Sequence, residues 1–372
     1  MKIIIAAGGT AGHINPGLAI AQHIKSRQSD AQMIFVGRQS GMEYKLVTKA
    51  GYEFRHMEVT GFQRRLSINN IKRNFVAIKN LLSANKKANK ILDDFSPDLV
   101  IGTGGYVSGP IVLAAAKRKI KTAIHEQNAF AGLTNKLLSK SVDKVFVASE
   151  KAAQYMANPE ECIVCGNPVR EEVQRANTQQ ARKELNLVGK TVILSFGGSL
   201  GAMALNKAMQ SLVLHNKNRR DIVHYHVVGG YDEGQFEAFL KSENIEQSEN
   251  LKVFDYLYDI PKYMAAADVI ISRCGALTIA EIACVGKASI LIPSPNVAEN
   301  HQYYNGRVLS DLGAALLIEE KDLNEKSIIS AFDKLYENQS LIRDMAQKAK
   351  SAYKADCLDI ICDNLEIFKK EI

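Results

Sequence analysis

The stretch IIIAAGGTAGH at residues 3–13 has a near copy, VILSFGGSLGA, at residues 192–202. Each copy starts with an apolar run of strand length and then passes through Gly-Gly-Thr or Gly-Gly-Ser, one further residue and a glycine. A glycine-rich turn between a strand and a helix is typical of parallel α/β sheets, where it directs backbone N–H groups toward an anion. Two such starts, offset by 189 residues, predict two similar α/β domains in tandem.

The same strand–turn–helix pattern fills the chain around the two copies. Further strands are predicted at AQMIFVG, DLVIG, TAIHE, KVFVAS and CIVCG in the first half, and at IVHYHVV, LKVF, DVIIS and ASILI in the second. Helices are predicted at 260–267, 277–285 and 299–312, and the chain looks helical from Glu325 to its end. The pattern places the domain boundary near Gly166-Asn167-Pro168. Periodicity does not decide on which domain the last helix packs.

Composition excludes several classes of protein. The chain has 372 residues, 46% of them hydrophobic and 23% charged, which rules out a disordered or fibrous protein. Six cysteines are too few for a disulfide scaffold. The uncharged stretch Leu99–Ala116 contains four glycines and Pro110, so a strand–loop–helix is expected there rather than a membrane span. We expect no signal peptide before the first strand, and a cytosolic protein with reduced thiols.

Charge is divided unevenly along the chain. Residues 1–168 carry 23 Lys and Arg against 12 Asp and Glu, or +11, whereas the remainder carries 24 against 28, or −4. We therefore expect only the first half to meet a polyanion or an anionic surface.

Four glycine loops follow predicted strands, at residues 8–12, 102–105, 197–201 and 273–276. Together they favour a phosphate-bearing ligand in the cleft between the domains. The dinucleotide pattern GxGxxG with its acidic partner, the ATPase pattern GxxxxGK[ST] and the metal-binding pair Asp-x-Asp are all missing from the sequence. Phosphates would then be neutralised by helix ends and arginine. The lone Cys162-x-x-Cys165 pair is interpreted as a buried strand end rather than a zinc site.

A basic, apolar strip runs from Val59 to Leu92 without an acidic residue. Its apolar side chains recur at helical spacing and its eight basic residues lie between them. Three interpretations are open from the residues alone: an ordinary core-facing helix, a membrane-surface element, and a nucleic-acid contact. No nucleic-acid-binding motif supports the third.

Six motifs stand in order along the chain: GGTAGHINPGLAIA, GTGGYVSGP, HEQNAFAGLTNKLLSK, GNPVR, GGSLGA and RCGALTIAEIA. Together they resemble the MurG family of bacterial UDP-N-acetylglucosamine:undecaprenyl-diphospho-muramoylpentapeptide N-acetylglucosaminyltransferases, from Met1 to about Asp311. The resemblance implies the GT-B fold, an α/β architecture of two Rossmann-like domains with parallel sheets facing across a cleft. Residues 1–168 with a C-terminal helix at about 350–372 would bind the acceptor and contact the membrane, and residues 169–349 would bind UDP-GlcNAc.

The activity implied by this resemblance is an inverting transfer of GlcNAc from UDP-GlcNAc to the C4 hydroxyl of MurNAc in lipid I, giving lipid II for peptidoglycan synthesis, and hence a role in cell-wall growth, cell shape and division. It also implies no cofactor and no essential metal, and a peripheral position on the anionic cytoplasmic membrane surface among other cell-wall synthesis proteins, without nucleic acid. Alternatives are another GT-B glycosyltransferase on a lipid acceptor, a UDP-GlcNAc 2-epimerase, and a noncatalytic UDP-sugar-binding protein.

The resemblance also assigns residues one at a time. His13 matches the family's proposed general base. The positions assigned to substrate binding are Thr10, Ala11, Gly12, Asn128, Arg170, Ser199, Leu257, Ala276, Leu277, Thr278, Glu281 and Gln302. The residues assigned to binding the acceptor diphosphate are Gly104, Gly105 and Tyr106. The residues assigned to membrane contact are Ile71, Phe75, Ile78, Lys72, Arg73 and Lys79. The chain departs from the family pattern at Ala11, where the family has glycine, and at His301, where it often has glutamine.

Overall fold

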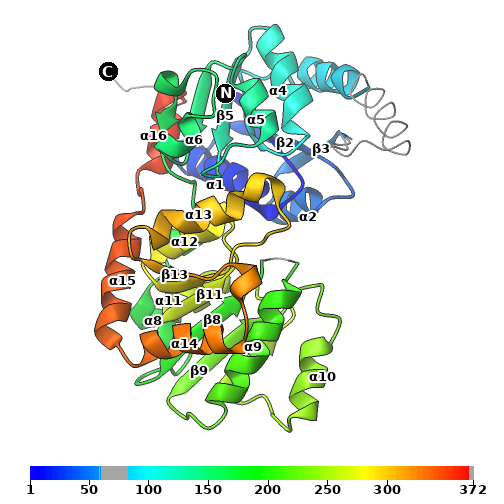
Figure 1. Ribbon diagram of the computed structural model, residues 1–372. Helices are drawn as coiled ribbons and strands as arrows, with labels where there is room; N and C mark the ends of the chain where they lie inside the picture. Colours follow the sequence, from blue (N-terminus) through cyan, green and yellow to red (C-terminus); the bar gives the residue numbers. More distant parts are fainter. Residues whose placement is uncertain (58, 60–82, 199, 368–372) are drawn as a thin grey trace, which may run out of the picture. The chain divides into compact units, whose positions relative to one another are not determined.

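The structure, a computed structural model, describes residues 1–57, 59, 83–198 and 200–367. The chain forms two compact units (Figure 1). Unit 1 contains Met1–Arg170 and Lys354–Ile372, and unit 2 contains Glu171–Tyr353. The first crossing between the units therefore falls two residues after the expected position, and residues 350–353 belong to unit 2 rather than to the terminal helix of unit 1.

Unit 1 is built on a parallel sheet of seven strands in the order β3-β2-β1-β4-β5-β6-β7. The strands are β1 Lys2–Ala7, β2 Gln32–Gly37, β3 Glu53–His56, β4 Leu99–Gly104, β5 Lys121–Glu126, β6 Lys144–Val147 and β7 Ile163–Val164. The central strands β1 and β4 are buried almost throughout, which explains their continuous apolar runs, since helices cover both faces of a parallel sheet. The edge strand β3, EFRH, is mostly exposed and was not predicted.

Helices lie on both faces of this sheet. They are α1 Ala11–Arg27, α2 Met42–Lys49, α4 Ser108–Lys117, α5 Leu133–Leu138, α6 Glu150–Ala153, α16 Cys357–Asn364 and the short η1 Pro159–Glu161. On one face α1 and α16 lie side by side in a common core (Figure 1). On the other face α4 packs with the helical residues 83–95. The last helix thus belongs to the first sheet, as the family resemblance implies.

Unit 2 repeats the same topology with six parallel strands in the order β10-β9-β8-β11-β12-β13. The strands are β8 Thr191–Phe196, β9 Ile222–Val227, β10 Leu251–Phe254, β11 Val269–Ser272, β12 Ala288–Leu291 and β13 Ala315–Leu317. The helices are α7 Glu171–Gln174, α8 Thr178–Glu184, α9 Met203–Asn216, α10 Gln235–Ser242, α11 Ile260–Ala266, α12 Ala276–Val285, α13 His301–Ser310, α14 Glu325–Tyr336 and α15 Gln339–Ser351, with η2 Ala298–Asn300 and η3 Glu320–Asp322.

The C-terminal region is divided into three helices rather than one. Asn324 begins α14 with a capping box, and Asn338 begins α15 by accepting a hydrogen bond from the Leu341 amide. Asparagine side chains satisfy helix N-terminal amides and so favour a new start over continuation. Among the described residues, no helix has the length and apolar character needed to cross a membrane.

Candidate functional site

In unit 1 the predicted residues lie in the loops that follow β1, β4 and β5, which are neighbours in the sheet. The loop after β1 leads into α1, whose N-cap is Thr10. The loop after β4 packs directly on it: Gly8 N–H donates to the Gly104 carbonyl oxygen at 3.3 Å, and a Cβ on Gly105 would lie 2.3 Å from the Gly8 oxygen. Gly104 and Gly105 both have positive φ, at 114° and 82°. Glycine is required at both positions because no side chain fits this approach.

His13 lies in the first turn of α1, half-buried against the Gly104 backbone. A Cβ on Gly104 would come within 2.4 Å of His13 Nδ1, so the imidazole rests where only glycine leaves room. The Thr103 hydroxyl donates to the His13 carbonyl oxygen at 2.7 Å and ties the helix start to β4. The structure therefore brings residues 10–13 and Gly104 together in one loop cluster.

Gln127 decides which nitrogen of His13 carries the proton. Its Nε2 lies 2.9 Å from the Thr103 carbonyl oxygen and 3.0 Å from the His125 carbonyl oxygen, so this atom is the amide nitrogen. Gln127 Oε1 then faces His13 Nδ1 at 3.2 Å and can only accept. Nδ1 must donate, and Nε2 of His13 keeps its lone pair. The HEQN motif alone does not reveal this role of Gln127, because the contact joins residues 114 positions apart.

Glu126 organises the loop that carries Asn128. Its carboxylate accepts from the backbone N–H of Asn128 at 2.9 Å and of Gly132 at 3.0 Å, and from the Asn135 amide at 2.9 Å. Glu126 is 1% exposed and serves to hold this loop. Asn128 is half-buried beside this carboxylate, and Tyr106 is 58% exposed.

In unit 2 the corresponding loop follows β8 and leads into α9. Gly198 and Gly201 have φ of 92° and 82°. A Cβ on Gly201 would lie 2.1 Å from the Val228 carbonyl oxygen, so the loops after β8 and β9 approach each other as closely as those after β1 and β4. Ser199 lies outside the described residues.

The start of α12 carries the next group of predicted positions. Gly275 is its N-cap, and Ala276, Leu277 and Thr278 form its first turn. The Gln302 side-chain oxygen accepts from the backbone N–H of Cys274 at 3.2 Å and of Ser294 at 3.0 Å. These two bonds orient the amide so that its NH₂ group remains to donate elsewhere. Gln302 therefore joins the loops after β11 and β12 next to a ten-residue helix N-terminus.

The remaining predicted positions of unit 2 are more dispersed. Glu281 is buried one turn further along α12, 8% exposed, and Leu257 is half-buried after β10. Arg273 donates to the Ile292 and Pro293 carbonyl oxygens and pairs with Glu320, so it braces the loop. Arg170, placed in the second half by the sequence, is the last residue of the first segment of unit 1. The six membrane-contact positions between residues 71 and 79 lie outside the described residues.

Unit 1 also contains a group of potential metal ligands. Within the described ranges, one group of three such side chains is close enough to hold an ion, namely His125, Cys165 and Cys357. None of these residues belongs to the predicted substrate site.

Comparison with known proteins identifies the family of the chain. The glycosyltransferase family 28 N-terminal domain matches residues 3–147, and the family 28 C-terminal domain matches residues 192–359. A protein of Caldanaerobacter subterraneus subsp. tengcongensis is 43% identical over 96% of both chains, and one of Acetivibrio thermocellus is 40% identical over 94% of both. Both are named UDP-N-acetylglucosamine--N-acetylmuramyl-(pentapeptide) pyrophosphoryl-undecaprenol N-acetylglucosamine transferase.

Solved structures share the fold. The crystal structure of Acinetobacter baumannii MurG has a TM-score of 0.75 at 27% identity and covers 99% of both chains. A UDP-bound structure of S. aureus MnaA has a TM-score of 0.70 at 11% identity, which is a likeness of fold alone. The predicted α/β fold with two Rossmann-like parallel sheets and the predicted family are both confirmed. The chain is a glycosyltransferase of family 28 and belongs, within it, to the family of UDP-N-acetylglucosamine--N-acetylmuramyl-(pentapeptide) pyrophosphoryl-undecaprenol N-acetylglucosamine transferases.

Proposed function

We propose that this chain transfers GlcNAc from UDP-GlcNAc to the C4 hydroxyl of MurNAc in undecaprenyl-diphospho-MurNAc-pentapeptide, inverting the anomeric centre and producing lipid II. Its relatives are named for this donor and this acceptor. The observation that carries the proposal is His13, whose Nδ1 is committed to Gln127 Oε1 at a glycine loop that opens a helix. A base with one nitrogen fixed as donor has the other ready to accept a proton.

In the proposed acceptor half-site, His13 Nε2 takes the proton of the C4 hydroxyl as the new glycosidic bond forms. Gly104, Gly105 and Tyr106 contribute to the place for the acceptor diphosphate, since the loop after β4 leaves backbone amides close to the start of α1. Thr10, Ala11 and Gly12 lie in the same loop cluster.

The proposed donor half-site is in unit 2. The N-terminus of α12, with Leu277 and Thr278, would stabilise the negative charge on departing UDP. Glu281 would accept both ribose hydroxyls, Gln302 would donate its oriented amide to a GlcNAc hydroxyl, and Leu257 would border the uracil. Ser199 and Arg170 remain assigned to the diphosphate by the family pattern. We propose that helix ends and these side chains neutralise the diphosphate without an essential metal or cofactor.

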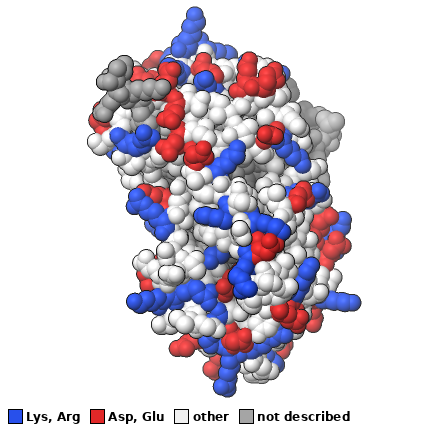
Figure 2. Space-filling view, turned by 90° about the vertical axis from the view of Figure 1, so that its left-hand side faces the viewer, with Lys and Arg blue, Asp and Glu red and all other residues white. Residues whose placement is uncertain are grey.

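We further propose that unit 1 meets the anionic cytoplasmic face of the membrane without crossing it. At the described end of the basic strip, Lys87 and Lys90 line a cavity of about 330 Å³ together with Arg55, His56 and the acidic Asp94. With three Lys or Arg side chains against one carboxylate, this lining favours phosphate headgroups. Over the face shown in Figure 2, by contrast, basic and acidic side chains are interspersed.

The test is UDP release from UDP-GlcNAc with EDTA present, with and without a short-chain lipid I analogue. We expect acceptor-dependent release and a β-1,4-linked disaccharide product. The variant His13→Ala should lower kcat by about 10²- to 10⁴-fold without changing UDP affinity, whereas His23→Ala, on the same helix, should retain turnover. UDP release or a C2-epimerised sugar without acceptor would instead identify an epimerase.

A further inference from the structure

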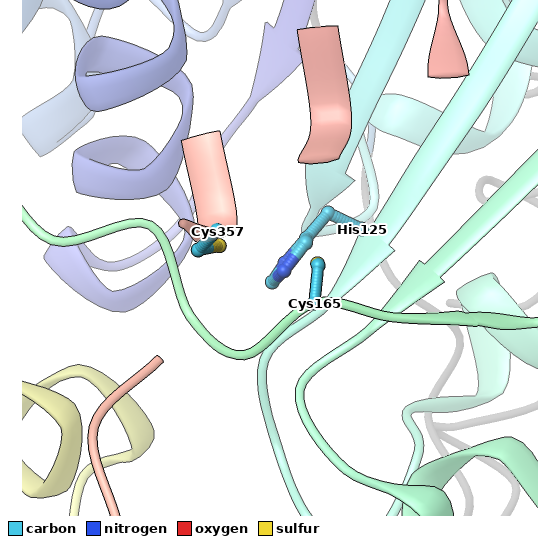
Figure 3. Close-up of side chains that lie close together, drawn as sticks. All are labelled: His125, Cys165 and Cys357. Atoms are coloured by element: carbon cyan, nitrogen blue, oxygen red, sulfur yellow. The ribbon is translucent and has the colours of Figure 1, made fainter. Parts of the chain in front are cut away.

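A buried pair of cysteine sulphurs lies in unit 1 beside His125 (Figure 3). Cys165 follows β7, and Cys357 is the first residue of α16. The relevant atoms of these two residues and of His125, on β5, all lie within 4.8 Å of one another. Cys165 is 0% exposed, Cys357 2% and His125 1%. Residues 192 positions apart are thus brought together by the docking of the last helix.

The histidine of this group is not available to a metal ion. Its Nε2 lies 2.9 Å from the Gly166 carbonyl oxygen, which can only accept, so Nε2 carries a proton. Its Nδ1 faces Gln127 Nε2, a nitrogen that can only donate, at 3.0 Å. With both nitrogens engaged, two sulphurs remain, fewer than a structural zinc site needs. The arrangement therefore favours chemistry between the sulphurs.

The surroundings make Cys165 the more reactive of the two thiols. The hydrogen bond from the Cys357 thiol lowers the pKa of Cys165 and outweighs burial, and the His125 N–H acts in the same direction. The same contact, together with burial, raises the pKa of Cys357. Cys165 is thus the more acidic of the two thiols, and Cys357 lies beside it as a resolving partner.

We propose that Cys165 and Cys357 form a reversible disulfide when the protein meets hydrogen peroxide. The Cys165 thiolate attacks one peroxide oxygen, the O–O bond breaks, and hydroxide leaves to become water. The Cys357 sulphur then attacks the resulting sulfenic sulphur, the S–O bond breaks, and a second water leaves with the Cys357 proton. Two thiols are oxidised by two electrons, and one peroxide is reduced to two waters.

Little movement is needed to close this bond. A disulfide is about 2.05 Å long, so the sulphurs approach by at most about 2.8 Å. Access comes through the start of α16: Lys354 packs over Gly166, next to Cys165, and donates to the Val164 carbonyl oxygen at 3.2 Å. Local opening of this segment admits a molecule as small as peroxide.

The bond would have a definite structural effect. The chain passes between the units twice, after Arg170 and after Tyr353. Cys165 lies just before the first passage and Cys357 just after the second. A disulfide would therefore hold both passages together on unit 1 and keep α16 on its sheet, reinforcing the contacts of Asp359 with Arg27 and His23.

The test uses the full-length reduced protein, treated with hydrogen peroxide, alkylated and digested without reductant. We expect a peptide linking Cys165 to Cys357, four instead of six titratable thiols after denaturation, and recovery with dithiothreitol. The matched control is Cys362→Ser: Cys362 is also buried on α16, and burial raises its pKa to about 12. This variant should still form the link, whereas Cys165→Ser and Cys357→Ser should not.

Hydrogen exchange of wild-type protein provides a readout that does not depend on the variants folding. Exchange across residues 357–364 should slow at least tenfold on oxidation and recover on reduction. A different disulfide partner, irreversible oxidation of Cys165 without a link, or unchanged exchange in linked protein would overturn the proposal. So would one equivalent of zinc in the untreated protein that is lost in Cys165→Ser.

Discussion

Gln127 could act by positioning His13 or only by supporting the loop, and the variants Gln127→Glu and Gln127→Leu distinguish these two roles. Both replacements remove the amide N–H groups that Gln127 donates to the Thr103 and His125 carbonyl oxygens. Glu keeps an oxygen opposite His13 Nδ1, where Gln127 Oε1 now lies at 3.2 Å, and Leu does not. The two variants therefore share one loss and differ in the acceptor.

We expect Gln127→Leu to lose more activity and Gln127→Glu to lose more stability. A net hydrogen bond is worth about 0.5–1.5 kcal/mol, or about 2- to 13-fold in rate, so kcat of Gln127→Leu should fall below that of Gln127→Glu by this factor. Stability should show the reverse, because the side chain is 2% exposed. In Gln127→Glu an unmatched carboxylate oxygen faces two carbonyl oxygens, at a cost of about 1–3 kcal/mol.

The assay measures kcat from acceptor-dependent UDP release at saturating substrates, with thermal melting of the same samples. We expect kcat in the order wild type, Glu, Leu, and melting temperature in the order wild type, Leu, Glu. If kcat instead follows stability, Gln127 only supports the loop and the tautomer argument is wrong. Adding Gln127→Leu to His13→Ala should cost no further activity, since the two residues act as a unit.

Three further predictions follow from contacts in the two units. Gly105→Ala should lower both stability and turnover more than Gly9→Ala, measured by melting and UDP release, because both have positive φ but only Gly105 meets a backbone oxygen, at 2.3 Å. Burial lowers the pKa of His224 to about 3 and that of His226 well below its usual value. The unfolded chain therefore binds more protons below about pH 6.5, and urea unfolding should show stability falling as pH drops from 6.5 to 5, by up to about 1.4 kcal/mol per pH unit for each imidazole; a flat profile contradicts this. Asp268→Asn should lower the free energy of unfolding by about 2 kcal/mol and with it the melting temperature. The Asp268 carboxylate accepts two hydrogen bonds from the partly buried Arg182 and one from the Val192 backbone N–H at 2.8 Å. An unchanged melting temperature would contradict this prediction.

Much of the fold could be predicted because its signals are local. Apolar runs such as KIIIAA and TVILSF form the central strands β1 and β8, and the glycine loops after them open α1 and α9. The predicted helix at 277–285 differs from α12 by one residue at its start. The edge strands β3 and β13 were missed. β3, EFRH, is mostly exposed and has no apolar run, and β13 is only three residues long.

The sequence alone determined the two parallel α/β repeats, the glycine loops at their strand ends and, through ordered motifs, the family. It could name His13 but not its protonation state. That state depends on Gln127, which in turn is oriented by carbonyl oxygens of β4 and β5. The docking of α16 and the proximity of Cys165 to Cys357 were likewise decided only by the tertiary structure. Strand and turn preferences act between neighbours along the chain. The contacts of His13 with Gln127 and of Cys165 with Cys357 instead join residues more than a hundred positions apart, and they exist only once the sheet of unit 1 has folded.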